Sequence, residues 1–217
     1  MPRRNRIDPW GDIHATKERG VFTGNRGCLV DDAEEVVRHH RGQLWIICMT
    51  EYRDWRVALA RPGRWTPIFF LDDAVALAAG HRPCGLCRRE AYQRYQDAVT
   101  TSERRDRPLG AGGLNRRLAS ERLRRGRGID RAADRILWTT EIDRLPLGTV
   151  IVDRDRRSQL VLDDRLLSFS FAGWGRAAPR PRSGEVEVLT PPTSVAALAH
   201  GFTPVLHPSA GRIGRRT

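Results

Sequence analysis

Short apolar runs separated by polar turns make up most of the chain. The run 44–49 is apolar and rich in β-branched residues, which predicts a buried strand. Residues 55–59 and 66–71 flank an Arg-Pro-Gly-Arg turn, so we expect a hairpin there. In the second half the strand-like pattern recurs at 148–152, 159–162, 166–171 and 185–189. The second half is therefore expected to be rich in β-structure.

Helix-capping residues divide the rest of the chain. Asp31 and Asp32 precede a segment that ends at Gly42, and Asp72 or Asp73 precede an alanine-rich segment that ends at Gly80. With three further segments of helical pattern, we expect helices from Asp31 or Asp32 to Arg41 and over 74–79, 88–99, 114–125 and 195–200. Residues 1–26 are rich in Gly, Asp and Arg and are expected to be irregular.

These elements predict an α+β fold in three parts. We expect a small zinc-binding module over 1–100, an arginine-rich helical linker over 101–140 and a β-rich C-terminal module over 141–217. The content of 40% hydrophobic residues and the six tryptophans are typical of a chain that forms a packed core.

No apolar run approaches the about 20 residues that a transmembrane helix needs. The basic start, residues 1–6, is followed by the mixed segment 7–12 in place of an apolar leader, so we expect a cytoplasmic protein. That compartment is reducing, which favours thiolate ligands over disulfides for the four cysteines.

The net charge of +12 and the pI of about 11.0 point to an anionic partner. Of the anionic partners, we expect a nucleic acid, with DNA as the first candidate, before an acidic protein or an acidic membrane surface. Lys17 is the only lysine, so nearly all the positive charge is arginine, which suits bidentate phosphate contacts. The residues expected on phosphates are Arg88, Arg89, Arg116, Arg117, Arg124 and Arg125. No aromatic residue interrupts 116–127, so binding there is expected to be backbone-directed and salt-sensitive.

The most informative motif is Cys84-x-x-Cys87, at an expected helix start. Two thiolates at this spacing can bind one Zn²⁺ from a single turn, and Cys28 and Cys48 would complete a four-sulfur site. A redox pair and a chance spacing are the alternatives, although no βαβ unit precedes the motif. A histidine among His39, His40 and His81 could replace one cysteine ligand.

Residues 69–88 run from an apolar strand through an alanine-rich helix to Gly80, Arg-Pro-Cys-x-x-Cys and a basic residue. This order resembles the zinc domain of the Ada-type DNA methylphosphotriester-repair proteins, closely over 69–88 and loosely over 48–90. The resemblance implies a small α/β zinc fold with four cysteine ligands, one of which accepts a methyl group from DNA. The family's first cysteine pair is Cys-x-x-x-Cys, whereas here Cys48 is followed by Tyr52 at that spacing.

Three function classes follow from the sequence. The first is a zinc-stabilised DNA-binding protein of repair or regulation. The second is an enzyme, with a zinc-bound Cys48 as alkyl acceptor or with a pocket in the C-terminal module. The third is a protein-interaction module in which zinc only stabilises the fold.

Overall fold

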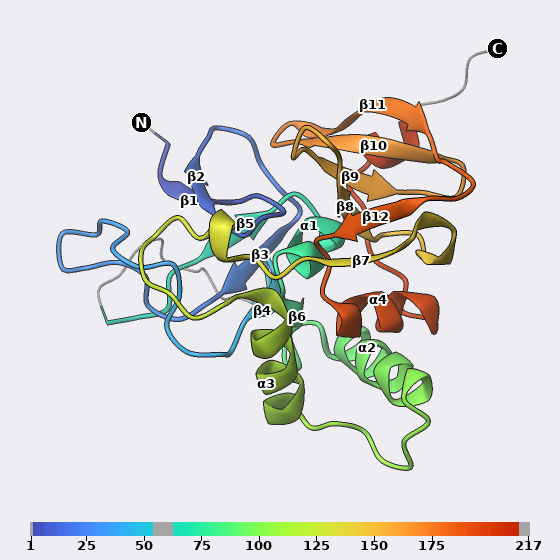
Figure 1. Cartoon of the computed structure of the whole chain (residues 1–217). Coiled ribbons are helices and arrows are strands. Elements are labelled where there is room, and N and C mark those ends of the chain that lie inside the picture. Colours follow the sequence, from blue (N-terminus) through green and yellow to red (C-terminus); the bar gives the residue numbers. More distant parts are fainter. Residues whose placement is uncertain (1, 54–62, 213–217) are drawn as a thin grey trace.

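The computed structural model describes residues 2–53 and 63–212, which form two β-sheets with helices packed between and beneath them (Figure 1). The strands of the first sheet are β1 (Arg4–Ile7), β2 (Ile13–Ala15), β3 (Phe22–Asn25), β4 (Ile46–Met49), β5 (Ile68–Phe70) and β6 (Arg82–Pro83). Their order is β2-β1-β5-β3-β4-β6, with parallel pairing of β1 with β5 and of β4 with β6. The expected strand at 44–49 is confirmed as β4, whereas β1, β2 and β3 lie in the segment expected to be irregular.

The second sheet is antiparallel throughout. Its strands are β7 (Trp138–Glu141), β8 (Val150–Val152), β9 (Ser158–Val161), β10 (Arg165–Ser170), β11 (Gly173–Pro179) and β12 (Glu185–Val188), in the order β11-β10-β9-β8-β12-β7. Four of these strands match the sequence pattern, and β7 and β11 are additional. With its helices and two sheets, the protein has an α+β fold, as expected.

The α-helices are α1 (Asp73–Ala78), α2 (Arg89–Ser102), α3 (Ala111–Arg122), α4 (Pro192–Ala199) and α5 (Ser209–Arg212), with short 3₁₀ helices at Ala132–Asp134 and Ile142–Arg144. Figure 1 shows α1 between the two sheets, and α2, α3 and α4 gathered below them. The hydroxyls of Tyr95 in α2 and Ser194 in α4 lie 2.9 Å apart, and Glu121 in α3 accepts hydrogen bonds from Thr193. The helices therefore join the two halves of the chain.

Helix α1 is the centre of the molecule, and all six of its residues are buried. Asp72 caps it by accepting the backbone N–H of Val75 at 3.0 Å. The other carboxylate oxygen of Asp72 accepts the indole N–H of Trp174 at 2.6 Å and the backbone N–H of His207 at 2.9 Å. The helix cap thus also binds β11 and the C-terminal segment.

One cluster of buried apolar side chains runs from the first sheet across α1 to the second sheet, from Ile7 to Ala210 along the chain. The segment expected as a linker contributes to the packing, because Leu114 and Leu118 of α3 are buried. The three expected parts of the chain therefore pack against one another. Within the described residues, no helix is long and apolar enough to span a membrane.

The helix expected from Asp31 or Asp32 to Arg41 is wrong, because these residues form turns. The Asp31 carboxylate accepts the backbone N–H groups of Ala33 and Glu35, both at 3.0 Å, and so closes a local turn. Glu34 has φ of +62°, which is incompatible with a right-handed helix. Most of the expected strand 55–59 and its turn lie outside the described residues, and its expected partner forms β5.

We predict that Asp72→Asn alters the pH dependence of stability. Burial raises the pKa of Asp72 from 3.8 to about 6, although its hydrogen bonds oppose the rise. Between these pH values the folded state holds a proton that the unfolded state has lost, so this residue makes the protein less stable as pH rises from about 4 to about 6, by up to about 3 kcal/mol.

Urea unfolding at pH 4 and pH 7 measures this effect. The Asp72→Asn protein should gain about 3 kcal/mol relative to wild type between the two pH values. Asp163→Asn, at an exposed position, is the control and should follow wild type. Parallel pH profiles for wild type and Asp72→Asn would contradict the prediction.

Candidate metal centre

Three cysteine side chains meet at the edge of the first sheet. Parallel pairing sets Ile47 of β4 opposite Pro83 of β6, and the backbone N–H of Cys84 donates to the carbonyl of Ile47 at 2.9 Å. Because Cys48 follows Ile47 and Cys84 follows Pro83, this register brings their side chains together. Cys87 reaches the same place from the turn before α2. The sulfur atoms of Cys48, Cys84 and Cys87 all lie within 4.8 Å of one another.

Backbone N–H groups point at two of these sulfurs. The N–H of Leu86 donates to Cys84 Sγ at 3.4 Å, and the N–H of Met49 donates to Cys87 Sγ at 3.4 Å. Donors in these positions stabilise thiolates over thiols. These two donors therefore act in favour of the thiolate at Cys84 and at Cys87.

The three thiols also share protons. The hydrogen bond from Cys48 lowers the pKa of Cys84, and the same contact is the largest cause of a raised pKa at Cys48. A bound cation removes this competition, because all three sulfurs can then be thiolates. Soft thiolates at this spacing suit Zn²⁺, which leaves one tetrahedral position for another ligand.

Cys28 lies outside this group, so the expected four-cysteine set is corrected to three cysteines among the described residues. Its buried thiol donates to the carbonyl of Val30 at 3.5 Å. The histidines weighed as replacements also lie elsewhere. His81 accepts a hydrogen bond from Arg26, and His39 contacts His40 and the carbonyl of Gly11.

Arg88, expected on a phosphate, is instead buried in the fold. Its guanidinium donates two hydrogen bonds to Asp73, at 2.5 and 2.8 Å, and lies over the ring of Phe22 at 3.9 Å. This pair connects the start of α2 to the start of α1, and Asp73 also accepts the backbone N–H of Val205. Arg88 therefore positions the cysteine turn, and both of its terminal nitrogens are bound to Asp73.

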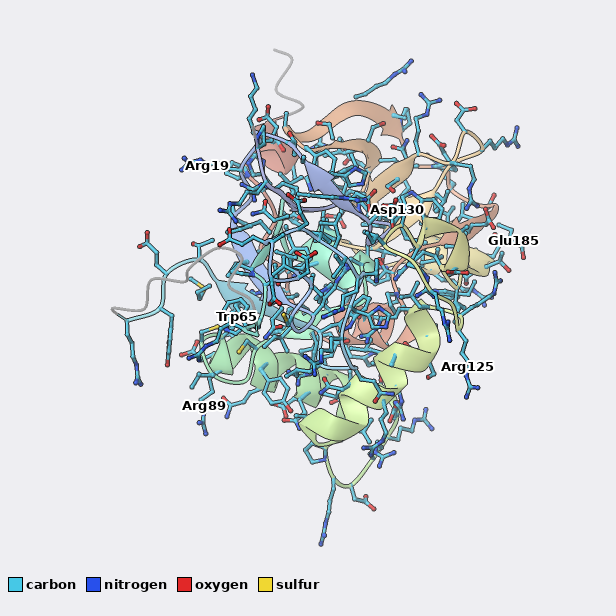
Figure 2. All side chains as sticks on the ribbon, turned by 90° about the vertical axis from the view of Figure 1, so that its left-hand side faces the viewer. Arg19, Trp65, Arg89, Arg125, Asp130 and Glu185 are labelled. Carbon is cyan, nitrogen blue, oxygen red and sulfur yellow. The ribbon has the colours of Figure 1, made fainter. Side chains whose placement is uncertain are left out.

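The other arginines expected on phosphates lie at the surface or near it. Arg117 is half-buried and paired with Glu103. Within residues 88–127, the exposed arginines without an ion pair are Arg89, Arg94, Arg104, Arg107, Arg116, Arg124, Arg125 and Arg127. We call this set the α2–α3 basic surface. Figure 2 shows Arg89 and Arg125 extending outward from opposite sides of the α2–α3 end of the molecule.

Sequence reasoning did not assign Arg94, Arg104 and Arg107 to this surface. The sequence feature that could have identified them is the excess of positive charge over 88–127, a segment with twelve arginines and five acidic residues. More than half of the chain's net charge of +12 lies in this segment.

Comparison with known proteins finds no relative, because no family model, curated protein or solved structure matches this chain. The resemblance to the Ada-type zinc domain therefore stays a prediction. What the structure itself provides is a cluster of three cysteines that could hold a metal ion.

We predict one zinc ion per chain, bound by Cys48, Cys84 and Cys87. Replacing any of the three with alanine removes a sulfur ligand, and zinc should be lost on dialysis. Cys28→Ala is the matched control and should retain the metal, because its sulfur lies outside the group. Metal analysis of tag-free protein measures the outcome. Loss of zinc from a folded Cys28→Ala protein would contradict this prediction and would show that Cys28 is a fourth ligand.

The neighbouring arginines at 88 and 89 give a second prediction. Arg88→Met leaves the buried Asp73 carboxylate unpaired and should lower the free energy of unfolding by about 3–5 kcal/mol. Arg89→Met removes an exposed side chain and should change it by no more than about 0.5 kcal/mol. Denaturant unfolding of the zinc-loaded proteins compares the two. Equal losses would show that Arg88 has no special structural role.

Proposed function

We propose that this protein binds Zn²⁺ at Cys48, Cys84 and Cys87. We further propose that its α2–α3 basic surface binds the sugar–phosphate backbone of a nucleic acid, with DNA as the first candidate. The observation that carries the proposal is the position of α2. This helix begins at Arg89, two residues after Cys87, and Figure 1 shows α2 and α3 at the same end of the molecule.

The metal has a structural role in this proposal. Before α2, the chain is fixed by the cysteine turn and by the Arg88–Asp73 pair. A zinc ion there would fix the start of the helix and so orient the arginines that follow. In this proposal, nucleic-acid binding by the α2–α3 basic surface would depend on the bound metal.

The composition of the surface favours backbone contacts over base reading. The planar guanidinium of arginine can donate two hydrogen bonds to the oxygens of one phosphate. The segment 116–127 contains no aromatic side chain that could stack on bases. Binding of this kind releases counterions and weakens steeply with salt. We therefore expect weak sequence preference and a strong salt dependence.

Binding of a labelled DNA duplex at several salt concentrations tests the proposal. The variant Arg124→Gln/Arg125→Gln should bind more weakly, and the slope of log K against log salt should fall in magnitude by about 2 if both residues contact phosphates. Arg154→Gln/Arg182→Gln is the matched control, since both residues are exposed arginines in turns of the second sheet. This control should bind like wild type.

Two outcomes would overturn nucleic-acid binding. One is an affinity no better than micromolar for duplex and single-stranded DNA at low salt. The other is an equal loss in the control variant, which would show that only total charge matters. Salt-insensitive binding to a protein, with no affinity for nucleic acid, would support the interaction-module class instead.

A second candidate rests on the three-sulfur ligand set. Three protein ligands leave one zinc position for a reactant, and a zinc-bound thiolate at Cys48, which is partly exposed, can act as a nucleophile. In alkyl transfer the Cys48 sulfur would form a bond to the methyl carbon of a phosphotriester. The carbon–oxygen bond would break, and its electron pair would remain on the phosphate. Mass spectrometry after incubation with methylated DNA tests this, and an unmodified Cys48 would exclude it.

A further inference from the structure

Two of the three clustered cysteines lie opposite each other on paired strands. The parallel pairing of β4 with β6 sets Ile47 opposite Pro83, and the backbone N–H of Cys84 donates to the carbonyl of Ile47 at 2.9 Å. Extending this register by one residue places Cys48 opposite Cys84. Residues at the same register on neighbouring strands direct their side chains to the same face of a sheet. The sulfur atoms of Cys48 and Cys84 accordingly lie within 4.8 Å of each other.

The spacing of the two strands suits a disulfide bond. Neighbouring strands of a sheet lie about 4.7–4.9 Å apart. Disulfides join residues whose Cα atoms are about 4.4–6.8 Å apart, so cysteines in register on such strands can be joined without movement of the backbone. Both cysteines are free in this structure. The sheet therefore holds Cys48 and Cys84 where an S–S bond can form.

The three cysteines differ in their access to solvent. Cys48 and Cys87 are half-buried, whereas only 8% of Cys84 is exposed. A small oxidant such as hydrogen peroxide therefore meets Cys48 or Cys87 before it meets Cys84. Of these two, Cys48 has Cys84 opposite it in the strand register, whereas Cys87 comes from the turn before α2 and lies outside that register. This arrangement favours Cys48 as the first sulfur to be oxidised and Cys84 as its partner.

We propose that Cys48 and Cys84 form an oxidation site, at which hydrogen peroxide creates a disulfide between them and thereby discharges the bound zinc. The discharge of zinc rests on the function proposed above. The disulfide does not, because the pairing of β4 with β6 brings the two sulfurs together.

One molecule of hydrogen peroxide balances the reaction. The Cys48 thiolate attacks one peroxide oxygen, the O–O bond breaks, and hydroxide leaves with its electron pair, so that Cys48 becomes a sulfenic acid. The Cys84 thiolate, which accepts the N–H of Leu86 at 3.4 Å, then attacks the Cys48 sulfur. The S–S bond forms, the S–O bond breaks, and a second hydroxide leaves. The two sulfurs are oxidised by two electrons in total, and the peroxide is reduced by the same two.

The disulfide would change what holds β6 onto β4. Zinc binds thiolates, so the disulfide removes two of the three metal ligands, and Cys87 alone does not retain the ion. The new bond joins Cys48 to Cys84 across the same two strands, so it replaces the metal as the link between them. The oxidised protein should therefore remain folded, and a dithiol reductant should restore the site.

Thiol counting and peptide mapping of the metal-free protein test the disulfide. The denatured reduced chain has four thiols, and one equivalent of hydrogen peroxide should lower this count by two. Mapping should find Cys48 joined to Cys84. In the zinc-loaded protein, the same treatment should release one zinc ion per chain to a colorimetric chelator. Dithiothreitol should reverse both changes.

Cys87→Ser and Cys48→Ser are a matched pair of variants, since each removes one sulfur of the cluster. Metal-free Cys87→Ser protein should still form the disulfide at about the wild-type rate, because both partners remain. Metal-free Cys48→Ser protein should form no disulfide over the same time. The mapping in wild type needs no variant, so it keeps the test valid if either variant fails to fold.

Two results would overturn the proposal. One is metal-free or zinc-loaded protein that keeps all four thiols under peroxide. The other is a disulfide that maps to Cys84 and Cys87, which would show that the turn and not the strand register selects the partners. A protein that binds no zinc but forms the Cys48–Cys84 disulfide would refute the metal site and support the oxidation site. None of these results depends on nucleic-acid binding.

Discussion

Two adjacent buried carboxylates at the start of α1 hold the two halves of the molecule together. Asp72 binds the Trp174 indole and the backbone of His207, and Asp73 binds the Arg88 guanidinium and the backbone of Val205. Side by side, two buried negative charges would repel strongly. Asp73 has a guanidinium partner, and Asp72 accepts three N–H donors, although burial still raises its pKa to about 6. Helix α1 is too short to be stable alone, so its position depends on these contacts.

This arrangement connects the three-cysteine cluster to the rest of the fold. Arg88 follows Cys87 directly, and its partner Asp73 also contacts the C-terminal segment. Movement of the cysteine turn would therefore disturb a buried ion pair as well as a metal ligand. Breaking a buried ion pair leaves an uncompensated charge, and here the pair connects the start of α2 to the start of α1.

The sequence predicted what depends on local patterns. Asp72, the alanine run and Gly80 specified α1, and the Cys-x-x-Cys spacing specified two of the three clustered cysteines. The strand that carries Cys48 was predictable from its apolar run, but only the pairing of β4 with β6 brings this cysteine to the other two. Cys28 was not excluded by any local signal, since only the pairing of β4 with β6 decides which sulfurs meet. The same holds for Arg88, because its sequence context is that of an exposed arginine, whereas its buried position follows from Asp73 across the fold. The segment after Asp31 was misleading, because a capping residue also closes a turn.

The three cysteines also lie where the first sheet has an edge strand. Strand β6 is the edge strand of that sheet and has only two residues, one of which is Pro83. An edge strand exposes backbone groups that can pair with another chain, and a proline with a short strand limits this. A metal ion held by Cys48, Cys84 and Cys87 would fasten β6 onto β4 across that edge. Without the ion, β4 would be covered by a two-residue strand alone. A metal ion bound there would therefore help to keep the edge of β4 covered against pairing with a strand of another chain.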